Sequence, residues 1–131
     1  MILDSSALIA ILRQEPEASQ FSAIVENAES CRISAVNYVE SAVVVDARRD
    51  PLDSRRFDKL IRQADLIIEP VTEEQAHIAR QAYRDFGKGS GHPAQLNFGD
   101  CFAYALAKDW GEPLLFKGDD FSRTDVASAL P

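Results

Sequence analysis

The stretch MILDSSALIAIL, residues 1–12, indicates how this chain begins to fold. Its apolar start suits a short buried strand, which ends at the acidic residue Asp4. Either Ser5 or Ser6 can cap a following helix, because a serine hydroxyl accepts a hydrogen bond from a free N–H of the first turn. The apolar positions of that helix recur at helical spacing, at Ala7, Leu8, Ile11 and Leu12. The stretch therefore predicts a strand that passes directly into a helix.

The same alternation of strand and helix continues along the chain. Short apolar runs predict three further strands, at residues 31–34, 66–69 and 114–116. Helical patterns lie between the strands, starting at Pro16, at Ala35 after a Ser34 cap and continuing to about Arg49, at Asp50-Pro51, at Thr72, and at Asn97. Buried strands separated by helices are typical of a parallel sheet covered on both faces. We therefore expect a three-layer α/β/α domain with a central parallel sheet.

Length and composition fit a single domain over residues 1–131. The chain is 46% hydrophobic, which is enough for one core and too little for two. No apolar run approaches the roughly 20 residues of a membrane span, and the start lacks the pattern of a secretory signal, so we expect a cytoplasmic protein with no membrane contact. Cys31 and Cys101 lie far apart in apolar segments, which predicts buried free thiols. We expect packing roles for three aromatic residues, Tyr38, Phe98 and Tyr104, with a cleft or partner groove as an alternative for the first.

The formal net charge of −7 argues against non-specific binding of nucleic acid, which normally needs a positive patch. Contact with phosphate would therefore be local, through metal ions and a few cations near a site. The cations nearest in sequence to the expected site are Arg13, Lys88, His92 and Lys117. The basic residues between positions 48 and 62 alternate with aspartates, which favours a solvated, ion-paired face over an RNA track.

Acidic residues follow the first and the last predicted strand. Asp4 ends the first strand, and Asp119 and Asp120 come shortly after the strand at 114–116. Ligands of open parallel sheets bind beyond the carboxyl ends of the strands, so these acids are expected at one rim. A local role is also open for each: Asp4 could cap the first helix, and Asp119 could form a turn with Gly118.

Two further acids lie on predicted helices. Glu40 falls within the apolar stripe of the helix that starts at Ala35, where a carboxylate needs a buried partner, a cleft or a metal, unless the helix leaves it at an edge. Asp100 lies in the first turn of a very apolar helix, beside Gly99, which allows close approach. Asp100 could hold a cation there or could form a simple capping arrangement with Asn97.

A convergence of these acids predicts a divalent cation. Carboxylates that share one site repel one another, and without a cation the pKa of at least one of them rises. All-oxygen ligands favour magnesium or manganese, which typically take one or two protein carboxylates together with waters and a substrate phosphate. Hydrolysis of a phosphodiester is the reaction that this equipment suits.

At this point the sequence resembles the PIN-domain ribonucleases, and among them the VapC-type toxins of type II toxin–antitoxin systems. The matching pieces follow the expected order over nearly the whole chain: ILDSSAL at 2–8, ISA at 33–35 leading to Glu40, Tyr83 through the GKG of 87–89, LNFGDCFAYALA at 96–107, and PLLFKGDDF at 113–121. Such an ordered set is far more specific than a lone aspartate after a strand.

The resemblance implies a magnesium-dependent endoribonuclease, the toxin component of a toxin–antitoxin module. By position, Asp4 and Asp100 would bind Mg²⁺ (or Mn²⁺), and Glu40 would complete the acidic cluster. Asp120 fits the family pattern best as a fourth acid, with the adjacent Asp119 as the alternative. Ser5 stands where these toxins more often have threonine, which keeps the hydroxyl. The family also implies an RNA substrate, a homodimer and a small cognate antitoxin that blocks the site.

Two other functions compete with this interpretation. A phosphohydrolase with an aspartate nucleophile after its first strand usually has a second acid two residues later, and position 6 here is serine. A catalytically inactive PIN-like module would only bind a partner protein, but all the expected acids are present.

Overall fold

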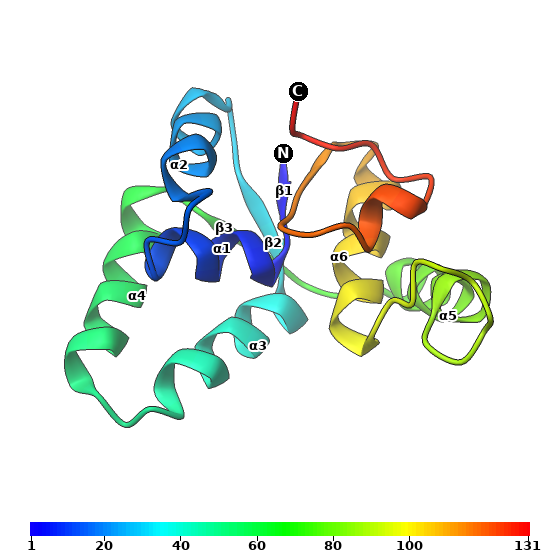
Figure 1. The fold of residues 1–131 in the computed structure, drawn as a ribbon, viewed down its shortest axis with the longest axis horizontal. Helices are drawn as coiled ribbons and strands as arrows, with labels where there is room; N and C mark the ends of the chain where they lie inside the picture. The colour runs from blue at the N-terminus through cyan, green and yellow to red at the C-terminus, as the bar shows by residue number, and fades with distance from the viewer.

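The computed structural model, which describes residues 1–131, has a four-stranded parallel sheet at its centre (Figure 1). The strand order is β3-β2-β1-β4, so the first strand lies inside the sheet. The strands are short: β1 (Ile2–Leu3), β2 (Arg32–Ser34), β3 (Ile67–Glu69) and β4 (Leu114–Leu115). Ile2 is level with Arg32 on one side and with Leu114 on the other. The predicted parallel sheet is thereby confirmed.

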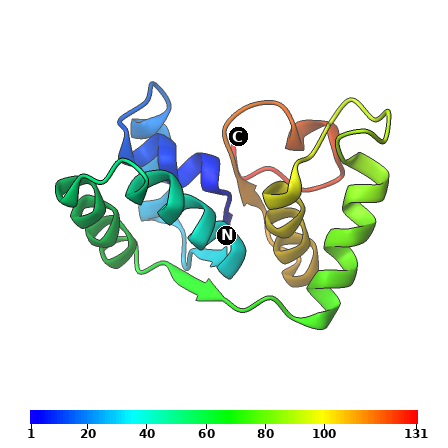
Figure 2. The same cartoon turned by 90° about the horizontal axis from the view of Figure 1, so that it is seen from below.

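Helices cover both faces of the sheet (Figures 1 and 2). One layer contains α1 (Ser5–Leu12), α2 (Ala18–Asn27), α3 (Ala35–Asp46) and α4 (Pro51–Gln63), and the other contains α5 (Glu73–Phe86) and α6 (Phe98–Trp110). Neighbouring side chains of a strand point to opposite faces, and the core divides accordingly. Ile2 and Leu114 pack with α5 and α6, whereas Leu3 and Leu115 pack with the other layer. This arrangement confirms the three-layer α/β/α fold.

The helix boundaries differ in detail from those predicted. The cap of α1 is Asp4 and not Ser5 or Ser6, because its carboxylate accepts a hydrogen bond from the Ser6 N–H. Helix α2 begins at Ala18, after a turn that contains Pro16, and α3 ends at Asp46. Ser34 caps α3 as predicted.

Two predictions about surface residues were wrong. Phe98 does not pack in the core, since 72% of its surface is exposed, whereas Tyr104 is buried as expected. The basic residues of α4 and of the preceding loop are solvated but mostly not ion-paired, because Arg48 with Asp53 is the one pair among them.

Cys31 and Cys101 are buried free thiols, as predicted. None of the helices combines the length and the apolar character needed to cross a membrane.

Candidate active site

The carboxyl edge of the sheet brings together chain segments that are far apart in the sequence. At this edge β1 leads into α1, β2 leads into α3, and the first turn of α6 packs against α3 (Figure 1). Asp4 caps α1 and Asp100 lies in the first turn of α6, whereas Glu40 lies further along α3, beyond its first turn. The parallel topology therefore delivers acids from β1, α3 and α6 to one place, as expected for the carboxyl ends of parallel strands.

Asp4 is buried, with 3% of its surface exposed. Its Oδ2 accepts hydrogen bonds from the Ser6 N–H at 3.0 Å and from the Ser6 hydroxyl at 2.5 Å. Its Oδ1 is equally buried and has no hydrogen-bond partner. Burial raises the pKa of Asp4, and the Glu40 charge adds to the rise, although the hydrogen bonds from Ser6 oppose it. Asp4 therefore caps α1 through Oδ2, while its Oδ1 is left without a hydrogen-bond partner.

Glu40 is held by two polar side chains of its surroundings. The Ser5 hydroxyl donates to Glu40 Oε1, and it also lies 3.2 Å from the Asn37 carbonyl oxygen. Asn37, which is completely buried, donates through Nδ2 to the Gly99 carbonyl oxygen at 2.9 Å and lies 3.4 Å from Glu40 Oε1. Asn37 thus links α3 to the start of α6 and fixes the position of Glu40 between them.

Gly99 gives Glu40 the space it occupies. A Cβ atom on Gly99 would overlap the Glu40 carboxylate, so any larger residue would force that side chain or the helix to move. The expectation that Gly99 permits a close approach is confirmed, and the group that approaches is the acid from α3.

Asp100 lies in the first turn of α6 and forms the capping arrangement with Asn97 that the sequence allowed. Its Oδ2 accepts from the Asn97 N–H at 3.0 Å, and its own N–H donates to Asn97 Oδ1 at 2.9 Å, which completes a capping box. Burial raises its pKa to about 7, and the charges of Asp4, Asp120 and Glu40 add to the rise, against the lowering effect of the Asn97 hydrogen bond. Asp100 therefore caps α6, and the charges of the three other acids contribute to its raised pKa.

The two acids after β4 differ in their surroundings. Asp120 precedes the 3₁₀ turn η1 (Phe121–Arg123) and is among the charges that raise the pKa of Asp100. The Asp119 carbonyl accepts hydrogen bonds from the Ser122 N–H at 3.1 Å and from the Ser122 hydroxyl at 2.6 Å, which closes a local turn. The geometry thus favours Asp120 as the fourth member of the acidic cluster, which we define as Asp4, Glu40, Asp100 and Asp120.

A divalent cation fits the donor set of this cluster. No group of three or more His, Cys, Asp or Glu side chains converges closely enough to hold a metal ion by itself. The orphaned Asp4 Oδ1 and the Asp100 carboxylate nevertheless provide two oxygen ligands of the kind that Mg²⁺ takes, with waters completing its shell. A cation there would also offset the repulsion among the acids, which adds to the larger effect of burial in raising both pKa values.

The cations predicted to lie near the site have other contacts or none. Lys117 Nζ pairs with Glu15 at 3.3 Å and with Glu17 at 3.4 Å, so its charge is already compensated. His92 Nδ1 accepts from the Ala94 N–H at 3.0 Å, so its ring is part of the local loop structure. Lys88 and Arg13 are exposed and form no ion pair.

Sequence reasoning missed Asn37 as a member of the site. The available signal was its position three residues before Glu40, which places both polar side chains on one face of an otherwise apolar helix. A buried asparagine at such a position has to find partners, and here they are Gly99 and Glu40.

Comparisons with known proteins agree with the fold and the resemblance. The family model described as PIN domain matches residues 1–127. Ribonuclease VapC28 of Mycobacterium tuberculosis is 56% identical over 130 residues, which cover 99% of this chain and 98% of that protein. The crystal structure of the sarcin–ricin loop cleaving toxin VapC20 of the same organism superimposes with a TM-score of 0.75 at 15% identity, covering 99% of this chain and 98% of the other. A toxin–antitoxin complex from Klebsiella pneumoniae superimposes with a TM-score of 0.69 at 17% identity, over 92% and 89% of the two chains.

The family model matches nearly the entire chain. Two chains that are 56% identical over their whole length share a fold and a family. The three-layer fold and the order of the matching motifs agree with it. This chain belongs to the PIN-domain family and is a relative of the VapC ribonucleases.

Proposed function

We propose that this protein is a magnesium-dependent endoribonuclease that hydrolyses RNA phosphodiester bonds and is the toxin of a type II toxin–antitoxin module. The observation that carries the proposal is the acidic cluster, in which Asp4 keeps a buried oxygen without a partner and burial, together with the charges of the other acids, raises the pKa of Asp100. The ribonuclease names of full-length relatives support the same activity. Manganese is expected to replace magnesium, because both prefer oxygen ligands.

In this proposal the chain supplies the ligands and the geometry. Asp4 and Asp100 hold the cation through the carboxylate oxygens that lack a protein donor. When bound, the ion neutralises the acids and polarises the phosphodiester and the attacking water. Ser5 and Asn37 fix Glu40 within the cluster, and Asp120, which follows β4, adds its charge. The capping box of α6 and the hydrogen bond from Asn37 to Gly99 hold these groups in place, which matters because small misplacements are costly in catalysis.

Two protein partners belong to this proposal: a second copy of the chain and a small cognate antitoxin. A complex of a toxin with its antitoxin is among the structural neighbours, which supports the second. The surface next to the site offers apolar side chains for such contacts, since Val39, Val43 and Phe98 are between 55% and 72% exposed and border a groove that Glu40 also lines. Exposed apolar patches of this kind commonly mark protein interfaces.

The test is cleavage of a mixed, structured RNA pool by antitoxin-free protein with Mg²⁺ or Mn²⁺, beside EDTA. Discrete cuts should require the metal and should be lost in Asp4→Asn and Asp100→Asn. The adjacent pair Asp119→Asn and Asp120→Asn provides a matched control, in which only the second should slow cleavage strongly. Cleavage that survives substitution of Asp4 and Asp100 would refute the proposed site. A folded protein that cuts no RNA would favour an inactive partner-binding module, and turnover of a chromogenic phosphomonoester would favour a phosphohydrolase.

A further inference from the structure

A second charged site lies at the far ends of α1 and α3. An open pocket of about 700 Å³ is lined there by three arginines, Arg13 after α1, Arg48 after α3 and Arg56 on α4, together with Asp50 and Asp53. Leu12 and Val45 contribute its apolar part. None of the acids of the active site lines this pocket, so it is separate from the acidic cluster.

The arginines of this pocket are largely free to bind an anion. Asp50 is engaged as the cap of α4, where its carboxylate accepts from the Leu52 N–H at 2.9 Å. Asp53 lies 3.7 Å from Arg48, a long ion pair with an arginine side chain that is 61% exposed. Arg13 and Arg56 are exposed and form no ion pair. Three arginines against two aspartates leave the pocket with a positive charge, on a chain whose net charge is −7.

The position of the pocket relative to the acidic cluster points to an extended anion. Both α1 and α3 begin near the acidic cluster, where Ser5 contacts Asn37 and Glu40. The residues of α1 and α3 that line the pocket lie at or just beyond the opposite ends of these helices. Helix α1 has eight residues, which at about 1.5 Å per residue separate its ends by roughly 12 Å. A stacked nucleic-acid strand, at about 3.4 Å per nucleotide, crosses that distance in three to four nucleotides.

We propose that Arg13, Arg48 and Arg56 form a phosphate-binding subsite for the RNA backbone, a few nucleotides from the bond that the acidic cluster cleaves. This inference rests on the proposed ribonuclease function. Guanidinium groups bind phosphate oxygens in a bidentate manner and position a strand without reading its bases. The net charge of −7 and the four carboxylates at the cleavage site repel RNA phosphates. The arginines of the subsite would attract these phosphates locally and so allow the strand to bind.

Binding can be measured separately from cleavage. In the Asp100→Asn background and with EDTA present, fluorescence anisotropy would follow a short labelled single-stranded RNA of mixed sequence. Arg13→Gln/Arg56→Gln should weaken binding about tenfold and should reduce the slope of log affinity against log salt by about 1.4, the value for two lost phosphate contacts on a single strand. Arg62→Gln/Arg84→Gln removes the same charge from exposed positions outside the pocket and should change binding far less.

The outcomes separate this inference from the proposed function. In the cleaving protein, the pocket variants should raise KM with little change in kcat. Equal weakening by both arginine pairs, or RNA affinity unchanged by the pocket pair in a protein that cleaves RNA, would overturn the subsite alone. Unchanged RNA affinity with weakened binding of a protein partner would assign the pocket to that partner instead. A parent protein that neither binds nor cleaves RNA would overturn both proposals.

Discussion

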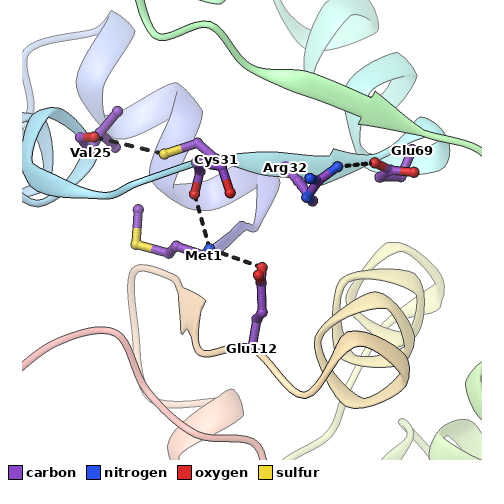
Figure 3. Close-up of polar contacts among 7 residues, drawn as sticks. Met1, Val25, Cys31, Arg32, Glu69 and Glu112 are labelled. Carbon is purple, nitrogen blue, oxygen red and sulfur yellow. Dashed lines mark hydrogen bonds and ion pairs between the residues drawn. The ribbon is translucent and has the colours of Figure 1, made fainter.

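Two groups of charged residues at the sheet differ in how their charges are balanced. Around the first residues of β1 and β2, the Met1 ammonium donates to the Ser30 carbonyl oxygen at 3.0 Å and to Glu112 Oε2 at 2.9 Å (Figure 3). Nearby, Arg32 pairs with Glu69 (Figure 3). The guanidinium carbon of Arg32 also lies 4.4 Å from the centre of the Trp110 ring. We call Met1, Arg32, Glu69 and Glu112 the paired cluster. Each acid there has a cation, and each cation has an acid.

The acidic cluster at the carboxyl edge has no such balance. Asp4, Glu40, Asp100 and Asp120 have hydrogen-bond donors around them but no ion pair with an arginine or lysine. Uncompensated buried carboxylates destabilise a fold, as the raised pKa values of Asp4 and Asp100 indicate. Acids of the paired cluster therefore form ion pairs within the chain, whereas the charges of the acidic cluster have no counter-charge from the chain.

The largest expected effect comes from removing the charge of one glutamate in each cluster. Glu40→Gln should lower RNA cleavage about 100-fold or more, the scale of one lost electrostatic group in an active site, with folding intact. Glu69→Gln should leave cleavage unchanged and lower the free energy of unfolding by about 1–3 kcal/mol, because the half-buried Arg32 loses its partner. Cleavage rates and urea titrations of both variants measure the difference. If both variants affected the same property, the division between the clusters would be wrong.

A second prediction concerns the space that Gly99 leaves for Glu40. Gly99→Ala should slow cleavage by about 10- to 100-fold and destabilise the protein by about 1–3 kcal/mol, because the new methyl group overlaps the carboxylate. Adding Glu40→Ala removes the overlap, so the double variant should regain stability without regaining cleavage. A double-mutant cycle of unfolding free energies measures this coupling. Additive losses would show that Gly99 serves only the backbone of α6.

The smallest effect is a dependence of stability on pH. The pKa of Asp100 is about 7 in the folded state, against an ordinary value of 3.8, so the folded state holds this proton more tightly than the unfolded state does. Stability of the metal-free protein is therefore lost as pH rises from about 4 to about 7. Asp100→Asn removes this loss, so in EDTA its Tm should exceed that of the wild type by about 3–6 °C at pH 8 and by progressively less toward pH 4.

Magnesium provides the control for the pH experiment. Added Mg²⁺ should raise the Tm of the wild type at pH 8 and should do little for Asp100→Asn, because binding to the folded state alone stabilises it. Parallel Tm curves for the two proteins across the whole pH range would show that the acidic cluster imposes no electrostatic cost.

Local patterns in the sequence predicted most of the secondary structure and the positions of the acids along it. The strand before Asp4, the Ser34 cap of α3 and the Asn97–Asp100 arrangement at α6 all involve residues within a few positions of one another. Hydrophobic periodicity and capping chemistry act over that range, so they can be read without knowing the fold. The carboxyl-edge rule for parallel sheets led to the expectation that Asp4 lies at one rim with the acids after the last strand, and the family resemblance added Glu40 to them.

The predictions that failed depend on which surfaces the packing covers. The sequence around Phe98 is as apolar as a core helix, yet its side chain lies on the outer side of the first turn. Lys117 seemed free to grip phosphate, but the fold brings it to Glu15, which is 102 positions away in the sequence. Neither outcome is encoded in the neighbouring residues.

Local sequence patterns were enough for the alternation of strands and helices, the caps of α3 and α6, and the acids that follow β1 and open α6. Tertiary structure alone decided the strand order, the contact of Asn37 with Gly99 across 62 positions, the orphaned oxygen of Asp4 and the gathering of three arginines at the ends of α1 and α3. The physical reason is the range of the interactions. Hydrogen bonds within a turn depend on neighbours in the chain, whereas burial and the balance of charges depend on all the segments that packing brings together.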